Sequence, residues 1–192
     1  MSIPGPDRMP PIPKEQWTDV QQKAAAEFAA ARKQDVFGPF AVMLRSPEVM
    51  LRASAMGEYM RYRTVLPPRL NELIILITAR HWTQQFEWHV HQPAAVKAGL
   101  GAGIVNAVAE GRRPDDMPEE EAIVHDFTTE LLRSQGVSDP IYAKAVAKFG
   151  EHGVIDMVGV VGYYSFLSMM MNTARTAVPA DSTVPALSTR RT

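Results

Sequence analysis

An apolar stretch at residues 70–79, LNELIILITA, constrains the fold more than any other part of the sequence. The apolar side chains at 73–79 cover more than one face of a helix, which indicates a helix buried on several sides. The segment that follows contains Glu87, His89 and His91. A buried helix and titratable side chains are therefore expected to meet in one place, and we expect the chemistry of the protein there.

Glu87 and His91 are four residues apart, so on an α-helix they lie on the same face, one turn from each other. A carboxylate beside an imidazole fixes its tautomer and raises its pKa, which makes a unit able to exchange a proton near neutral pH. Glu72 lies near the start of the preceding apolar run. Antiparallel packing of the two helices would add its carboxylate, so we expect two carboxylates and one imidazole to share a pocket.

Each of these residues also has a structural interpretation. Glu72 can serve only as a first-turn acid that stabilises a helix N-terminus. Glu87 and His91 can form an exposed pair, worth about 0.3–0.5 kcal/mol. We expect neither a metal nor another cofactor. If a metal is bound, these three residues are the candidate ligands, since His89 points about 200° away from His91 around the helix.

The order of these motifs is characteristic. A Glu-Leu step and an apolar helix lead to Ala79-Arg80, then to Glu-Trp-x-x-His, and then to an alanine-rich segment that ends in Ala98-Gly99-Leu100. This order resembles the carboxymuconolactone decarboxylase and alkylhydroperoxidase D superfamily over roughly residues 38–178. The resemblance implies an all-α, alkylhydroperoxidase D-like helical bundle that forms homo-oligomers, either trimers or hexamers.

One departure from the family decides between its branches. In the peroxidase branch, a glutamate, a pair of cysteines and a histidine occupy the positions of Glu72, Gln84, Glu87 and His91. Both cysteines are replaced here, and the chain has no cysteine at all. Thiol peroxidase and disulfide reductase chemistry are excluded, because both need a thiolate. The decarboxylase branch has a glutamate four residues before its histidine, as in this chain.

The resemblance therefore implies a carboxy-lyase that works without a cofactor on a small carboxylated lactone or ring acid, as in the catabolism of aromatic compounds. Loss of carbon dioxide leaves electrons that must enter a conjugated carbonyl, and the enolate must then be protonated on carbon. We expect His91 to be the acid, Glu87 to orient and tune it, and Glu72 to act as a second relay residue.

The substrate carboxylate and the developing anion require a cationic or hydrogen-bonding group. Arg80, about two turns after Glu72 on the same helix, is the first candidate and Arg45 the second, although either arginine can equally form a structural salt bridge. His89 and Tyr163 complete the set of substrate-binding candidates. Core packing is an equal alternative for Tyr163.

Two other classes of function stay open. The chain can be a metal-binding or non-catalytic helical oligomer that kept the scaffold, or another lyase, hydrolase or isomerase that uses the same glutamates and histidine. An enzyme needs a pocket in which Glu87 and His91 face a common space. A structural remnant would fill that space with side chains.

Composition limits the partners. The net charge of −1 and the pI near 6.5 give no electrostatic footprint for nucleic acid or an anionic membrane. The first residues lack the pattern of a signal peptide. Residues 154–171 come closest to a membrane span, but Asp156 favours a buried helix. We expect a cytoplasmic protein with a small-molecule carboxylated substrate and with no nucleic-acid or membrane partner.

The chain of 192 residues suits one domain with a sizeable core. We expect a proline-rich extended arm at 1–13, available to a neighbouring subunit, one helical domain at 14–178, and a loose polar tail at 179–192. The helix propensity of an alanine-rich stretch predicts a helix at 14–33. Further helices are expected at 47–63, 104–110, 118–134, 138–149 and 154–176. Two more follow Pro67-Pro68: the helix of Glu72, and then a helix that kinks or restarts at Pro93 and stops at Gly99.

Overall fold

The computed structural model describes residues 5–189, and these residues form helices and connecting segments without a strand. The elements are the 3-10 helix η1 (Lys14–Gln16) and the α-helices α1 (Asp19–Arg32), α2 (Gly38–Met43), α3 (Pro47–Tyr62), α4 (Pro68–Trp82), α5 (Gln85–Lys97), α6 (Ala102–Glu110), α7 (Glu119–Ser134) and α8 (Asp139–Ala174). The predicted all-α class is confirmed.

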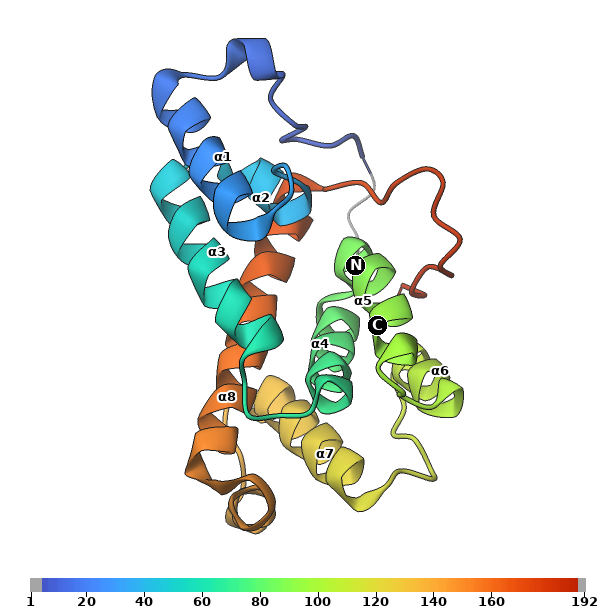
Figure 1. Cartoon of the computed structure of the whole chain (residues 1–192). Helices are drawn as coiled ribbons and strands as arrows, with labels where there is room; N and C mark the ends of the chain where they lie inside the picture. Colours follow the sequence, from blue (N-terminus) through green and yellow to red (C-terminus); the bar gives the residue numbers. More distant parts are fainter. Residues whose placement is uncertain (1–4, 190–192) are drawn as a thin grey trace.

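Helix α4 is the centre of the fold. Every side chain from 70 to 80 is buried, as the apolar run predicts. Helices α5, α6, α7 and α8 all contact α4, and Figure 1 shows them arranged around it. Helices α1, α2 and α3 form a second group that packs on α8. Burial of each large apolar side chain contributes about 1.5–3 kcal/mol, so α4 accounts for much of the hydrophobic stabilisation.

The first predicted helix, at 14–33, is divided in the structure. A short 3-10 helix is followed by extended backbone at Trp17, and α1 begins only at Asp19. Thr18 and Gln21 form a capping box, in which each side chain accepts a hydrogen bond from the backbone of the other residue. This local capping sets the start of α1 five residues later than helix propensity alone predicts.

Helix α5 does not restart after His91. It runs without interruption from Gln85 to Lys97 with Pro93 inside. The missing N–H of Pro93 removes one hydrogen bond from the helix, but Ala95, in the next half-turn, is fully buried and holds this part of the helix in place. Gly99, with a φ of 95°, follows the end of the helix as predicted.

Helix α8 combines the last two predicted helices. Gly150, with φ 68° and ψ 174°, is not helical and separates a first segment from a longer second one that crosses the core. Within residues 5–189, α8 is long and apolar enough to cross a membrane by length and composition alone. However, 56% of its most apolar window is buried in the fold, as in the core helix of many proteins. A cytoplasmic location stays a prediction.

The two terminal segments lie on their own chain. The N–H of Arg8 donates to the carbonyl of Ala174 at the end of α8, and Arg45 donates to the carbonyl of Pro10. Leu187 exchanges two hydrogen bonds with the side chain of Gln85, and it is buried. The expectation of a loose tail is therefore wrong for residues 182–188. The parts of the arm and tail at 1–4 and 190–192 lie outside the described residues.

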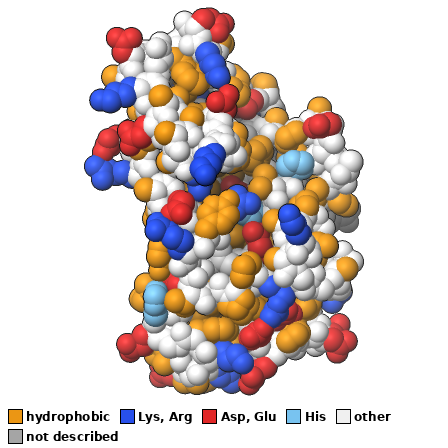
Figure 2. Space-filling view, in the orientation of Figure 1, with side chains coloured by type: hydrophobic (Ala, Val, Ile, Leu, Met, Phe, Trp, Pro, Cys, Tyr) orange, Lys and Arg blue, Asp and Glu red, His pale blue; other side chains and the backbone are white. Residues whose placement is uncertain are grey.

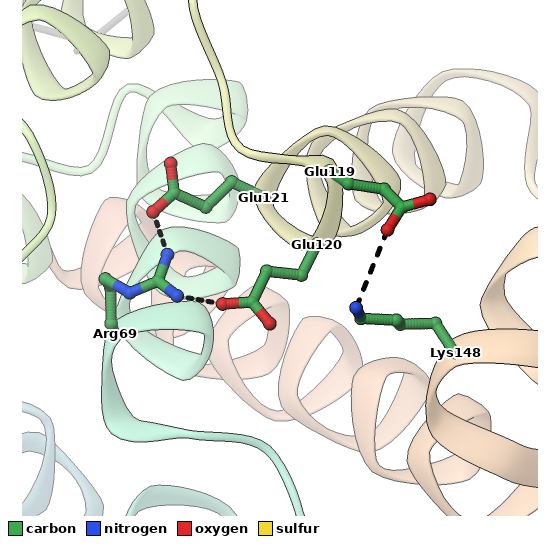
Figure 3. A network of polar contacts seen from close by, with 5 residues as sticks. All are labelled: Arg69, Glu119, Glu120, Glu121 and Lys148. Carbon is green, nitrogen blue, oxygen red and sulfur yellow. Dashed lines mark hydrogen bonds and ion pairs between the residues drawn. The ribbon is translucent and has the colours of Figure 1, made fainter.

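A polar network fastens the start of α4 to the start of α7. Arg69 forms ion pairs with Glu120 and Glu121, while Glu119 lies 3.6 Å from the ammonium of Lys148 on α8 (Figure 3). The acidic first turn that favours the N-terminus of α7 thus also links three helices. It holds the N-terminal turn of α4, which precedes Glu72, in a defined position.

Candidate active site

His91 lies between two carboxylates. Its Nδ1 atom is 2.7 Å from Oε2 of Glu72 on α4, and its Nε2 atom is 3.4 Å from Oε2 of Glu87, one turn earlier on α5. The two glutamates and the histidine converge as predicted, but only Glu87 and His91 line a common pocket, so the expectation that Glu72 shares it is not met. The closer contact is with Glu72, the partner from the neighbouring helix.

The turn between α4 and α5 brings these residues together. Thr83 takes a left-handed conformation with a φ of 49° and ends α4. The side-chain oxygen of Gln84 then accepts hydrogen bonds from the backbone N–H groups of Phe86 and Glu87, so it caps α5. The amide of Gln84 also donates to Asn172 on α8 at 3.0 Å. The start of α5, and with it Glu87, is therefore anchored to the core.

All three side chains are buried. The exposed fractions are 8% for Glu72, 3% for Glu87 and 2% for His91. An exposed pair of Glu87 and His91 is therefore ruled out. Burying a charged group costs free energy unless it is paired, so the two carboxylates stabilise the charged form of the imidazole between them.

The carboxylates control the protonation of His91. Burial alone lowers the pKa of a histidine, but the hydrogen bond to Glu72, the contact with Glu87 and the two negative charges raise it by more. The pKa of His91 therefore lies above its usual value of 6.5. This shift favours the protonated imidazole, which can act as a proton donor.

Glu87 and His91 face a common pocket, which has an internal volume of about 30 Å³. Helices α1, α2, α3, α5 and α8 contribute its walls. The lining residues are Arg32, Phe37, Pro39, Phe40, Gly57, Arg61, Phe86, Glu87, Val90, His91, Tyr163, Tyr164 and Leu167. The walls thus combine apolar side chains with two cations, one carboxylate, one imidazole and two phenols.

Two tyrosines of α8 complete the interior of the pocket. The ring of Tyr164 meets the ring of His91 edge-on, at 5.0 Å between centroids. Burial and the charge of Glu87 raise the pKa of Tyr164, and the hydroxyl therefore stays protonated. The hydroxyl of Tyr163 is buried and has no hydrogen-bond partner within residues 5–189. Gly57 makes room for it, because a Cβ atom there would lie 2.0 Å from this hydroxyl.

Three predicted substrate-binding residues lie away from this pocket. Arg80 lines a separate small pocket and donates to the carbonyl of Ser188. His89 lies 2.6 Å from the hydroxyl of Ser182 in the C-terminal segment. Arg45 holds the N-terminal segment. Tyr163 is the one member of the predicted set that reaches the pocket.

Arg32 and Arg61 line the pocket, and sequence reasoning missed both. They belong to α1 and α3, far in sequence from the motif around Glu87. No spacing rule links an arginine on one helix to a histidine on another when the packing of the helices is unknown. Only the tertiary structure brings these cations to the imidazole.

A larger cavity of about 400 Å³ lies between α7 and the first segment of α8. Four of its five charged residues form two ion pairs: Arg113 makes two hydrogen bonds to Asp126, and Lys148 pairs with Glu119 (Figure 3). Size alone does not make a catalytic site. The smaller pocket is the better candidate, because buried titratable groups converge there.

Across residues 5–189, no group of three or more histidine, cysteine, aspartate and glutamate side chains has the arrangement of a metal site. Both ring nitrogens of His91 are directed at carboxylates. A metal bound by Glu72, Glu87 and His91 would need one of these contacts to open. The residues present fit hydrogen bonding better than coordination.

Comparison of the sequence with models of known families finds no match, and comparison with curated proteins finds no significant one. Membership of the decarboxylase superfamily is therefore a proposal that rests on the order of the motifs. The convergence of Glu72, Glu87 and His91 in space supports it, because the three motif residues form one buried cluster.

Proposed function

We propose that this protein is a cofactor-independent, decarboxylase-like carboxy-lyase that acts on a small carboxylated lactone or related ring acid. The observation that carries the proposal is the buried imidazole of His91, which is held between Glu72 and Glu87 in the wall of a pocket lined by two arginines. A protonated imidazole and nearby cations are the groups that this reaction needs.

The reaction begins with cleavage of the bond between the ring carbon and the substrate carboxylate. Carbon dioxide leaves, and the electron pair enters the conjugated carbonyl to form an enolate. His91 then donates its proton to carbon and recovers one from solvent after the product leaves. The raised pKa of His91 favours the protonated form that this step requires.

The geometry suggests a different division of roles from the one expected for the two glutamates. Glu72 makes the shorter contact, to Nδ1, and so it orients the ring and stabilises its charged form. Glu87 lies in the pocket wall beside Nε2. In this proposal Glu72 positions the acid, while Glu87 lies next to the path of the proton to the substrate.

The first test is a decarboxylation assay with 4-carboxymuconolactone that follows release of carbon dioxide. The wild-type protein is compared with Glu87→Gln and His91→Ala, and circular dichroism checks that both variants are folded. We expect turnover in the wild type and its loss in both variants. Full activity in folded His91→Ala would remove His91 from the mechanism.

A non-catalytic scaffold is the second candidate, and the small volume of the pocket favours it. About 30 Å³ holds only one or two water molecules, less than a ring acid needs. An enzyme therefore has to open this pocket to bind its substrate. Absence of turnover with 4-carboxymuconolactone and with other ring acids would support the scaffold.

We also propose that the chain forms homo-oligomers, as trimers or hexamers. Ile155, Val158, Phe166 and Met169 lie on one face of α8, and between 37% and 67% of each is exposed. Gly162 lies within the same face and is exposed as well. An exposed apolar helix face of this kind is typical of a subunit interface. Light scattering should show an oligomer that Ile155→Glu dissociates.

A further inference from the structure

We propose that Arg32 and Arg61 form an anion-binding pair that holds a carboxylate of a small ring acid at the mouth of the His91 pocket. This inference rests on the proposed function, since it names the groups that recognise the substrate. It assigns to these two residues the role that sequence reasoning gave to Arg80. The inference is carried by the hydrogen bonding, the charge balance and the apolar walls of the pocket.

Arg32 has unused hydrogen-bonding capacity in the pocket. It lies in the last turn of α1, and its side chain lies over the ring of Phe40, with 5.3 Å from the guanidinium carbon to the ring centroid. Its Nε atom is buried and lacks a hydrogen-bond partner among the residues that the structure describes. A buried donor without a partner is costly, so a ligand acceptor would relieve this cost.

Arg61 is a second cation without a carboxylate partner. It lies on α3, is half-buried, and its guanidinium lies 5.3 Å from the ring centroid of Tyr62. Between residues 5 and 189, no acidic side chain forms an ion pair with Arg32 or Arg61. By contrast, Arg52 and Arg63 on or next to α3 each pair with a glutamate.

The charged groups in and next to the pocket leave one positive charge unmatched, which one anion would neutralise. When His91 is protonated, its charge and that of Glu72 cancel. Glu87 then offsets one of the two arginines, and one positive charge stays unmatched. A carboxylate would neutralise it, and the planar guanidinium group can bind both carboxylate oxygens at once.

The apolar walls fit the rest of such a ligand. Phe37, Phe86 and Val90 line the same pocket as the two arginines. Their side chains offer a surface for a flat ring, while the arginines take its carboxylate. Arg32 and Arg61 are only half-buried, so their side chains can turn outward and enlarge the entrance. The ligand class is therefore a small ring with at least one carboxylate.

Calorimetric titration with 2-furoate, an unreactive ring acid, tests the pair directly. We expect the wild-type protein to bind 2-furoate, and Arg32→Gln and Arg61→Gln each to bind it about tenfold more weakly or worse. Furfuryl alcohol, the neutral analogue, should not compete. Arg52→Gln, on the exposed side of α3, is the matched control and should bind as the wild type does. Thermal melts should show all three variants folded.

Three results would overturn the anion-binding pair: no binding of 2-furoate to the wild type, unchanged binding in both arginine variants, or equal binding of furfuryl alcohol. The decarboxylation assay separates this inference from the proposed function. Arginine-dependent binding of 2-furoate without turnover of any lactone would refute the enzyme and keep the pair. Turnover with an unchanged KM in both arginine variants would refute the pair and keep the enzyme.

Discussion

The Nδ1 atom of His91 lies 2.7 Å from Oε2 of Glu72, a residue nineteen positions earlier on a different helix. This contact is shorter than the one between His91 and Glu87 on its own helix, at 3.4 Å. The orientation of the His91 ring therefore depends on how α4 and α5 pack against each other. Under the proposed function, a change that shifts the two helices should lower turnover before it unfolds the protein.

Glu72→Gln should lower both the pKa of His91 and the rate of turnover. The amide keeps the size of the side chain but removes the negative charge that favours the imidazolium. We expect turnover to fall about 100-fold or more, the usual scale for general acid catalysis. NMR titration of the His91 ring and initial rates would measure both effects. Glu48→Gln, an exposed change on α3, is the control, and an unchanged pKa of His91 in Glu72→Gln would contradict the assigned role.

The stability of the protein should depend on pH in two separate windows. Since the pKa of His91 is raised on folding, its proton stabilises the folded state fully below pH 6.5. That contribution is lost as the pH rises from 6.5 through the pKa in the folded protein. Burial lowers the pKa of His125 despite its contact with Asp126. Stability should therefore fall as the pH drops below 6.5 through the lowered pKa of His125.

Urea unfolding from about pH 5 to pH 9 would resolve these windows. His91→Asn should flatten the curve of unfolding free energy above pH 6.5, and His125→Asn should flatten it below. If His91→Asn changed only the acidic side, the raised pKa of His91 would be wrong.

Tyr163→Phe should increase stability and weaken substrate binding. The hydroxyl of Tyr163 is buried without a partner in the described part of the chain, so its removal should raise the free energy of unfolding by about 1 kcal/mol. The same hydroxyl lies in the pocket, and we expect KM to rise several-fold. Thermal melts should show the gain in stability, and steady-state kinetics should show the rise in KM. Tyr142→Phe, at an exposed site on α8, should change neither quantity.

Arg69→Met should destabilise the fold by about 3 kcal/mol, because it leaves the buried carboxylate of Glu121 without its cation (Figure 3). Removing both charges in Arg69→Met/Glu121→Leu should recover most of that loss. Urea denaturation of the wild type, the single variant and the double variant would measure these changes in the free energy of unfolding. Arg52→Met breaks an exposed ion pair on α3 and should cost under about 1 kcal/mol. An equal loss in the single and double variants would show that Glu121 does not depend on Arg69.

The face of the molecule in Figure 2 mixes acidic, basic and hydrophobic side chains. A broad area of one charge sign is not visible on that face, which agrees with the net charge of −1. This feature adds no support for nucleic-acid binding, and the absence of such a partner stays a prediction. Recognition in the proposed function depends instead on the few charges inside the pocket.

Local signals predicted much of the helical framework. Pro47 and Pro68 each lie in the first turn of a helix, and Gly99 follows the end of another, because their backbone limits act within a few residues. The start of α1 was missed, since the capping box of Thr18 overrides the helix propensity of the residues before it. Of the two alternatives predicted at Pro93, a kink or a restart, the restart does not occur, because α5 runs from Gln85 to Lys97 with Pro93 inside.

The sequence by itself determined the all-helical class, the buried character of α4 and the pairing of Glu87 with His91, since periodicity and spacing follow from helix geometry alone. Only the tertiary structure decided that Glu72 makes the closer contact, that Arg80 faces another pocket, and that Arg32 and Arg61 reach this one. The direction of a side chain between helices depends on many weak packing contacts across the whole chain. Rules based on neighbouring residues in the sequence do not describe these contacts.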